Sequence, residues 1–76
     1  GGRQMLRLRI NTALIRQLRL ETGLSRVKAV EQSGIRYETL KKLEEQRDYQ
    51  ATLDTISRMA HFYKVEPLDL LIQHED

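Results

Sequence analysis

The fold is decided by residues 25–45, which read SRVKAVEQSGIRYETLKKLEE. Ser25 is a helix N-cap residue, and a short helix is expected from there to about Ser33. Gly34 then breaks the helix, because ending it in the left-handed conformation costs about 1–2 kcal/mol for a residue with a Cβ. A second helix is expected over about 37–45. Two short helices joined by a tight glycine turn predict a helix-turn-helix unit.

The apolar residues of this unit separate an inner face from an outer face. Ala29 and Val30 lie inward on the first helix, and Leu40 and Leu43 bury the back of the second. This spacing leaves a set of polar residues toward the outer side of the second helix: Arg36, Tyr37, Glu38, Lys41 and Lys42. That outer side is therefore the candidate binding surface.

Helical signals continue on both sides of the unit. Asn11 marks the start of an earlier helix, which Gly23 ends. Thr52 caps a later helix whose apolar residues recur at helical spacing, namely Leu53, Ile56, Met59, Ala60 and Tyr63. Pro67 suits the first position of a short fifth helix that contains Leu68, Leu70, Leu71 and Ile72. Five short helices with tight connections predict an all-α fold, a compact five-helix bundle.

The ends of the chain do not follow the helical pattern. We interpret residues 1–4 as a cloning remnant and residues 5–10 as an extended arm. Within the arm, Leu-Arg-Leu-Arg-Ile alternates with the period of a strand, and no partner strand is expected in the chain. The arm therefore either pairs with a copy of itself or packs down as an extended segment. The helix-turn-helix domain is placed over 11–73, with a polar tail over 74–76.

Composition excludes several classes of protein. The 76 residues include no Cys, so neither a disulfide nor a thiolate metal site is expected, and the two histidines are isolated. No apolar run approaches the ~18 residues of a membrane span, and arginines interrupt any signal-peptide core, which favours a cytoplasmic protein without membrane contact. No catalytic triad order, phosphate loop or metal-ligand cluster occurs. We therefore expect no enzyme, no cofactor and no metal.

The net charge of +2 hides an asymmetry along the chain. Residues 1–43 contain ten Lys/Arg and three Asp/Glu, whereas residues 44–76 contain three and eight. This division favours a basic surface that faces a polyanion and an acidic back that stays in solvent. A solvated surface with uneven charge is the plainer explanation, and charge alone does not decide between the two.

The sequence resembles the Cro and phage-repressor type of helix-turn-helix domain, the XRE class, over about residues 8–72. The resemblance is carried by three motifs. The first helix and its end match at Leu18-Arg19-x-x-x-Gly23-Leu24-Ser25, and the turn and recognition helix match at Gly34-Ile35 and Leu40-x-x-Leu43-Glu44. The most specific match is the closing pattern Thr52-Leu53-x-x-Ile56-x-x-Met59-Ala60-x-x-Tyr63-x-Val65-x-Pro67-x-Asp69-Leu70-Leu71.

The resemblance implies sequence-specific binding of double-stranded DNA by a repressor-like transcriptional regulator, in a phage, mobile-element or toxin–antitoxin setting. The helix over about 37–45 would enter the major groove. The candidate DNA contacts are Arg26, Arg36, Tyr37, Glu38, Lys41, Lys42 and Arg47. The resemblance also implies a buried ion pair between Arg19 and Glu44, which fixes the angle between two helices.

One recognition helix contacts few bases, so we expect two copies spaced about one helical turn apart on DNA. The expected homodimer is joined through the Leu6–Ile10 arm or through the Leu68/Leu71/Ile72 cluster of the last helix. A protein partner, either a toxin or another regulator, is a further candidate. Arg7 and Arg9 form either a minor-groove arm or the exposed face of a dimer strand.

Several assignments have an alternative. Lys41 and Lys42 contact phosphates or guanine edges, or they pair with Glu38 on a solvated helix face. Tyr37 meets a thymine methyl or a phosphate, or it packs over the turn. Glu38 accepts from cytosine, excludes wrong sequences or pairs locally.

The chain also departs from the family pattern near its candidate site. Arg36 stands where a Ser or Thr cap is usual, and it cannot cap a helix. After Glu44 the family often has Asn-Gly, whereas this chain has Glu45-Gln46, and a carboxylate near DNA phosphates is unfavourable. The acidic residues Glu38, Glu44 and Glu45 support an alternative function, a protein–protein interaction module built on a helix-turn-helix fold with a degenerate recognition helix.

Overall fold

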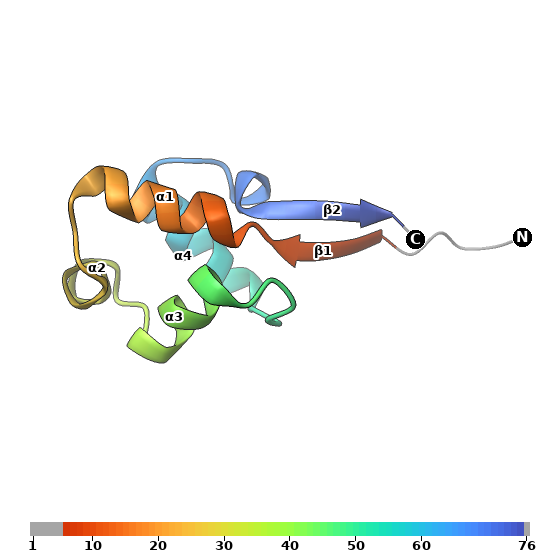
Figure 1. Ribbon diagram of the computed structural model, residues 1–76. Coiled ribbons are helices and arrows are strands. Elements are labelled where there is room, and N and C mark those ends of the chain that lie inside the picture. The colour runs from red at the N-terminus through yellow and green to blue at the C-terminus, as the bar shows by residue number, and fades with distance from the viewer. Residues whose placement is uncertain (1–5, 76) are drawn as a thin grey trace, which may run out of the picture.

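The computed structural model describes residues 6–75, and it describes side chains over residues 9–72. Its elements follow in the order β1 (Leu6–Ile10), α1 (Thr12–Thr22), α2 (Arg26–Ser33), α3 (Tyr37–Glu45), α4 (Leu53–Tyr63), the 3₁₀ helix η1 (Pro67–Leu70) and β2 (Leu71–Glu75). The four α-helices form a body from which the β1–β2 ribbon projects (Figure 1). The interpretation of residues 1–4 as a cloning remnant lies outside the described residues.

The helix boundaries follow from local capping signals. Asn11, Ser25 and Thr52 each accept a hydrogen bond from the backbone N–H three residues later, and this confirms the three starts predicted from the sequence. Gly23 and Gly34 end α1 and α2 in the left-handed region, with φ of 75° and 76°. The helix-turn-helix unit is therefore fixed by short-range chemistry.

A single apolar cluster holds the helices together. Its members come from every α-helix, the turn, η1 and the base of the ribbon: Ile10, Ile15, Ala29, Ile35, Leu40, Leu43, Ile56, Met59, Ala60 and Leu70. Leu43 has no exposed surface, so its truncation to alanine is expected to remove a large part of the stability. The core lies behind α3 and supports it.

The segment after α4 corrects the prediction of a fifth α-helix. Pro67 begins a single turn of 3₁₀ helix, which Glu66 and Asp69 close with a reciprocal capping box. Leu70 is fully buried at its end, and the backbone of Leu71 is extended, with φ of −121° and ψ of 145°. The chain leaves the helical conformation here because the backbone of residues 71–75 pairs with the extended backbone of β1, whose peptide groups need hydrogen-bond partners.

The prediction that the N-terminal arm has no partner within the chain is therefore wrong. β1 pairs with β2 in an antiparallel register that runs from Leu6 opposite Glu75 to Ile10 opposite Leu71. The backbone N–H of Asn11 continues the ladder by donating to the carbonyl of Leu70 at 2.9 Å. Residues 74 and 75, predicted as part of a polar tail, belong to this ribbon.

Candidate nucleic-acid interface

The turn between α2 and α3 sets the direction of the candidate recognition helix. Gly34 adopts the left-handed conformation, and Ile35 after it is 5% exposed, anchored in the core. The Ser33 hydroxyl accepts the backbone N–H of Ile35 at 3.2 Å, which tightens the turn. Arg36 precedes α3 with extended backbone and makes no side-chain cap, as its residue type predicted. The turn holds α3 against the core at its first residue.

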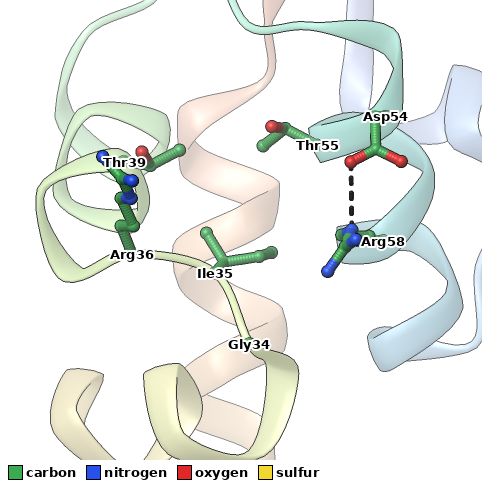
Figure 2. Close-up of a pocket in the computed structure, with 7 residues that line it drawn as sticks. All are labelled: Gly34, Ile35, Arg36, Thr39, Asp54, Thr55 and Arg58. Carbon is green, nitrogen blue, oxygen red and sulfur yellow. Dashed lines mark hydrogen bonds and ion pairs between the residues drawn. The ribbon is translucent and has the colours of Figure 1, made fainter.

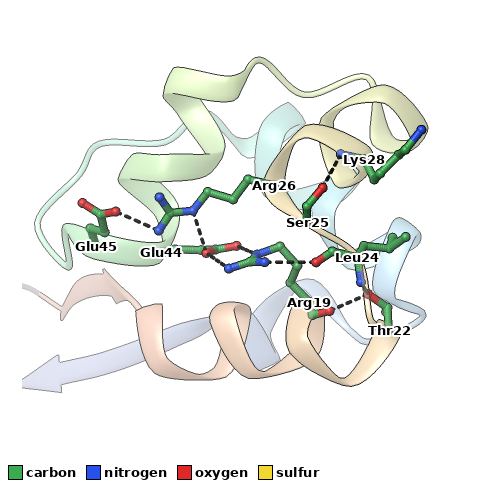
Figure 3. Close-up of polar contacts among 8 residues, drawn as sticks. All are labelled: Arg19, Thr22, Leu24, Ser25, Arg26, Lys28, Glu44 and Glu45. Atoms are coloured by element: carbon green, nitrogen blue, oxygen red, sulfur yellow. Dashed lines mark hydrogen bonds and ion pairs between the residues drawn. The ribbon is translucent and has the colours of Figure 1, made fainter.

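A buried ion pair fixes the other end of α3 to α1. The Glu44 side chain has no exposed surface, and Arg19 donates to both of its oxygens, Nε to Oε2 at 2.7 Å and Nη2 to Oε1 at 3.0 Å (Figure 3). Arg19 also donates from Nη1 to the backbone carbonyl of Leu24 at 3.0 Å. The pair that the resemblance implied is thus present. Its fork geometry sets the angle between the two helices.

Arg26, at the start of α2, joins the same network. Its Nε donates to Glu44 Oε1 at 3.1 Å and its Nη2 donates to Glu45 Oε2 at 2.7 Å (Figure 3). Burial lowers the pKa of the Arg26 guanidinium, but the contacts with Glu44, Glu45 and Tyr37 and the charge of Glu44 together raise the pKa by more, so the net direction is upward. The sequence-predicted phosphate contact is therefore held by carboxylates of its own chain, a contact that spacing along the sequence did not reveal.

This network also links the two oppositely charged halves of the chain. Arg19 and Arg26 of the basic half pair with Glu44 and Glu45 of the acidic half, and Arg9 lies 3.5 Å from Asp48. Part of the positive charge of the first half is thus paired with carboxylates of the second half. For binding, the charged side chains without an ion-pair partner in the described part of the chain therefore matter more than the net charge of either half.

The first half of α3 gathers the free polar residues. Arg36, Tyr37, Glu38 and Lys41 are all exposed, and Tyr37 is 43% exposed. Over the side chains of residues 9–72, no ion pair joins Glu38 to Lys41 or Lys42, so the local pairing considered from the sequence is not formed. These four side chains form the outward patch of α3.

The remaining predicted contacts lie at or after the end of α3. Lys42 is half-buried, and its Nζ lies 5.4 Å from the centre of the Tyr49 ring, which is cation–π distance. Arg47 is exposed in the α3–α4 loop, and its backbone carbonyl accepts the N–H of Ile10 at 3.0 Å. The structure therefore separates Lys42, which is packed against the loop, from the outward patch.

A cavity of about 300 Å³ lies beside the start of α3, between the turn and α4 (Figure 2). Arg36 and Thr39 line it on one side, and Asp54 and Arg58 line it on the other. Arg58 donates from Nε to Asp54 Oδ2 at 3.0 Å. Sequence reasoning did not single out Arg58, because its helical position gave no sign that it approaches the turn.

Tyr63 presents a different polar feature inside the body. Its hydroxyl is buried, and it has no hydrogen-bond partner. Burial raises the pKa of Tyr63 to about 12, and the nearby Glu44 carboxylate adds to the rise while Arg19 opposes it. Tyr63 therefore lies close enough to the buried ion pair to sense its charges.

The described part of the chain offers little for other chemistry. Among these residues no group of three or more His, Asp or Glu side chains is placed to hold a metal ion. No α-helix in the same range is long and apolar enough to cross a membrane. The chemistry of the site is thus that of charged and aromatic side chains on a rigid helix.

Comparison with known proteins agrees with this geometry. A family model described as helix-turn-helix matches residues 15–70, from within α1 to the end of η1. No curated protein and no solved structure was found to match the chain. The matched range covers most of the chain and includes α2, α3 and α4, the glycine turn and the Arg19–Glu44 pair. The chain therefore belongs to the Cro/C1-type helix-turn-helix family, the XRE class.

Proposed function

We propose that this protein is a repressor-like transcriptional regulator that binds specific double-stranded DNA through α3. The observation that carries the proposal is the outward patch of α3, Arg36, Tyr37, Glu38 and Lys41, which is exposed on the recognition helix of a helix-turn-helix fold. The helix is held from behind by Leu40, Leu43 and Glu44, so the patch is presented on a rigid element.

Each side chain of the patch has a chemical partner in the major groove. Arg36 and Lys41 donate to guanine O6 and N7 or to phosphate oxygens. Glu38 accepts from the cytosine amino group, and Tyr37 contacts a thymine methyl. Arg47 in the loop after α3 supplies a flanking phosphate contact. This distribution gives base readout to the first half of α3 and backbone positioning to its flanks.

Arg26 takes part only after exchanging partners. Its Nη2 is hydrogen-bonded to Glu45, the more exposed of its two carboxylates, whose side chain is 46% exposed. A phosphate oxygen at this position competes with Glu45 for the same donor, and it also repels the carboxylate. DNA binding by this chain is therefore expected to be weaker than the number of its cations suggests.

Two copies are needed for useful affinity and specificity. A single α3 reaches a few base pairs, and two recognition helices about one turn of DNA apart combine their contacts on two half-sites. We therefore propose that the regulator acts as a homodimer.

The direct test is a titration of labelled random duplex DNA at two salt concentrations. About 4–6 phosphate contacts predict a log–log slope of binding constant against salt near −4 to −5. Lys41→Ala combined with Lys42→Ala should weaken binding without unfolding the domain. Lys64→Gln, at the C-terminal end of α4, serves as a control for the loss of a positive charge outside α3. A double variant that binds as well as the parent contradicts the groove assignment.

The alternative, a protein-interaction module, is favoured by one observation. Glu45 forms an ion pair with Arg26, and Glu38 is exposed within the outward patch. The surface is therefore less basic than a phosphate-binding face usually is. Tight binding to a protein partner together with no measurable duplex affinity at low salt would select this alternative. Selection of bound sequences from a random duplex pool separates the two functions and reports the symmetry of the site.

A further inference from the structure

The loop between α3 and α4, residues 46–51, is attached to the rest of the molecule at two places. The first attachment is to α3, where the Lys42 ammonium lies 5.4 Å from the centre of the Tyr49 ring, which also packs against the core. The second attachment is to the base of β1, beside which the loop runs (Figure 1). Arg47 lies in this loop with its side chain exposed.

The attachment to β1 begins with a backbone hydrogen bond at the edge of the ribbon. Ile10 lies opposite Leu71 of β2, and its N–H donates to the Arg47 carbonyl at 3.0 Å. An edge strand otherwise leaves such an N–H to water. The Ile10 side chain is 3% exposed, so the donor is itself anchored in the core. The backbone of Arg47 is therefore held by a fixed element, although the residue belongs to a loop.

A side-chain contact lies next to this hydrogen bond. Arg9 Nε is 3.5 Å from Asp48 Oδ1, so consecutive residues of β1 meet consecutive residues of the loop in opposite directions. The Asp48 side chain is 85% exposed, so the ion pair orients the loop more than it stabilises the fold. We call the Ile10–Arg47 hydrogen bond and the Arg9–Asp48 ion pair together the β1 clamp.

We infer that the β1 clamp positions Arg47 for a contact with a DNA phosphate, and that Arg9 and Asp48 are positioning residues that act through Arg47. This inference rests on the proposed function, in which Arg47 contacts the DNA backbone beside α3. A cation on an unattached loop loses conformational freedom when it binds, and this loss weakens the contact. The β1 clamp restricts the loop before DNA arrives, so less freedom is lost on binding.

The sign of one substitution separates positioning from simple electrostatics. Asp48 is an exposed carboxylate beside a residue that contacts phosphate, so removal of its charge would by itself raise the affinity for a polyanion. Positioning predicts the opposite: Asp48→Asn should lower the affinity about twofold to threefold, because Arg47 is less well oriented. Asp48→Glu keeps the charge and should bind like the parent. Fluorescence anisotropy with a selected duplex measures all three chains, and a gain of affinity in Asp48→Asn overturns the inference.

A double-mutant cycle shows whether Asp48 acts through Arg47. The loss caused by Asp48→Asn should disappear when Arg47→Gln is already present, because no phosphate contact is then left to position. Glu21→Gln on the exposed part of α1 removes the same charge and should leave the affinity unchanged in both backgrounds. An equal loss from Asp48→Asn in both backgrounds means that the residue does not act through Arg47, and this overturns the inference.

Amide hydrogen exchange reports the β1 clamp directly, and the chain contains a matched control. The Asn11 N–H follows Ile10 in the sequence but donates to the Leu70 carbonyl at 2.9 Å, away from the loop. Asp48→Asn should speed exchange at Ile10 and leave exchange at Asn11 unchanged. Binding of duplex DNA to the parent should slow exchange at Ile10 more than at Asn11, because a ligand stabilises the arrangement that it binds. Equal changes at the two amides overturn the inference.

The same measurements distinguish a failure of this inference from a failure of the proposed function. A parent that binds duplex DNA, together with an Asp48→Asn variant that binds equally well or better, contradicts the inference and leaves the proposed function in place. A parent with no measurable duplex affinity at low salt contradicts both, since Arg47 then has no phosphate to contact.

Discussion

The two halves of α3 differ in how they use their charges. In the second half, Lys42 lies on the Tyr49 ring, Glu44 holds two arginines and Glu45 holds one. In the first half, Glu38 and Lys41 have no ion-pair partner among the side chains of residues 9–72. One end of the helix is therefore locked to the body, and the other is left free to meet a ligand.

Burial explains the difference between the two halves. A charge that is taken out of water requires a partner, because its hydration is lost. The Glu44 side chain is fully buried, so it is satisfied by two guanidinium groups, whereas Lys41 keeps its water. Variants that remove a buried, paired charge or an exposed, unpaired charge test this difference between the two halves of α3.

The largest effect is expected from Glu44→Ala. Removal of this carboxylate leaves Arg19, which is 11% exposed, without its partner, so we expect a loss of about 3–5 kcal/mol of unfolding free energy. Glu45→Ala is the control, since an exposed pair contributes about 0–1 kcal/mol. Urea unfolding followed by circular dichroism measures both. Equal losses of unfolding free energy in the two variants would contradict the claim that Glu44 fixes the second half of α3 to the body.

Tyr63→Phe is expected to show its effect at alkaline pH. The unfolded pKa is near 10.0 and the folded pKa is about 12, so the folded state keeps the proton longer. This contribution is complete below pH 10 and is lost as the pH rises from 10 toward 12, amounting to about 1–2 kcal/mol after allowance for partial exposure.

The phenylalanine variant lacks this loss, because it has no titratable hydroxyl at this position, and the hydroxyl that it removes has no hydrogen-bond partner. Its stability at neutral pH should equal or exceed that of the parent. Paired urea titrations at pH 8 and pH 11 measure the difference between the chains. A parallel decline in both chains would mean that Tyr63 is solvated in the folded state.

Lys41→Ala and Lys42→Ala compare how the first and second halves of α3 contribute to DNA affinity. We expect Lys41→Ala to weaken specific binding about tenfold, a loss near 1.4 kcal/mol, because its ammonium is free to contact a base or a phosphate. Lys42→Ala should have a smaller effect, since its ammonium is already on Tyr49. Fluorescence anisotropy with a selected duplex measures both, and a reversed order would contradict the comparison.

The smallest effect is expected from Glu45→Gln, which should raise DNA affinity a few-fold. The change weakens the hold on Arg26 and removes a negative charge near the phosphates, so the salt slope should steepen by about 1. Glu21→Gln on α1 is the matched control, and it should leave affinity unchanged. Lower affinity in Glu45→Gln would show that the Arg26–Glu45 pair helps to shape the site.

The sequence predicted those features that depend on neighbouring residues. The starts of α1, α2 and α4 rest on Asn11, Ser25 and Thr52, and the turn rests on Gly34, so local signals were sufficient. The outward patch of α3 follows from helical spacing for the same reason.

The features that escaped prediction depend on contacts between distant parts of the chain. The spacing of Leu68, Leu70, Leu71 and Ile72 predicted a helix, although β2 begins at Leu71. Only the pairing of β2 with β1 shows the strand, and this pairing joins segments near opposite ends of the sequence. The Arg26–Glu45 contact likewise spans 19 positions. Propensity gives no information at such separations, because tertiary context decides the outcome.

The antiparallel ribbon has a mechanical consequence. Both strands begin or end at its tip, where Leu6 lies opposite Glu75, so tension applied to the two ends of the chain loads the ladder one residue pair at a time (Figure 1). Such unzipping would yield at low force and stop at Ile10 and Leu71, where the hydrophobic core takes the load. Stretching is therefore expected to release the strands as a compliant first step and to leave the helices bearing α3 intact.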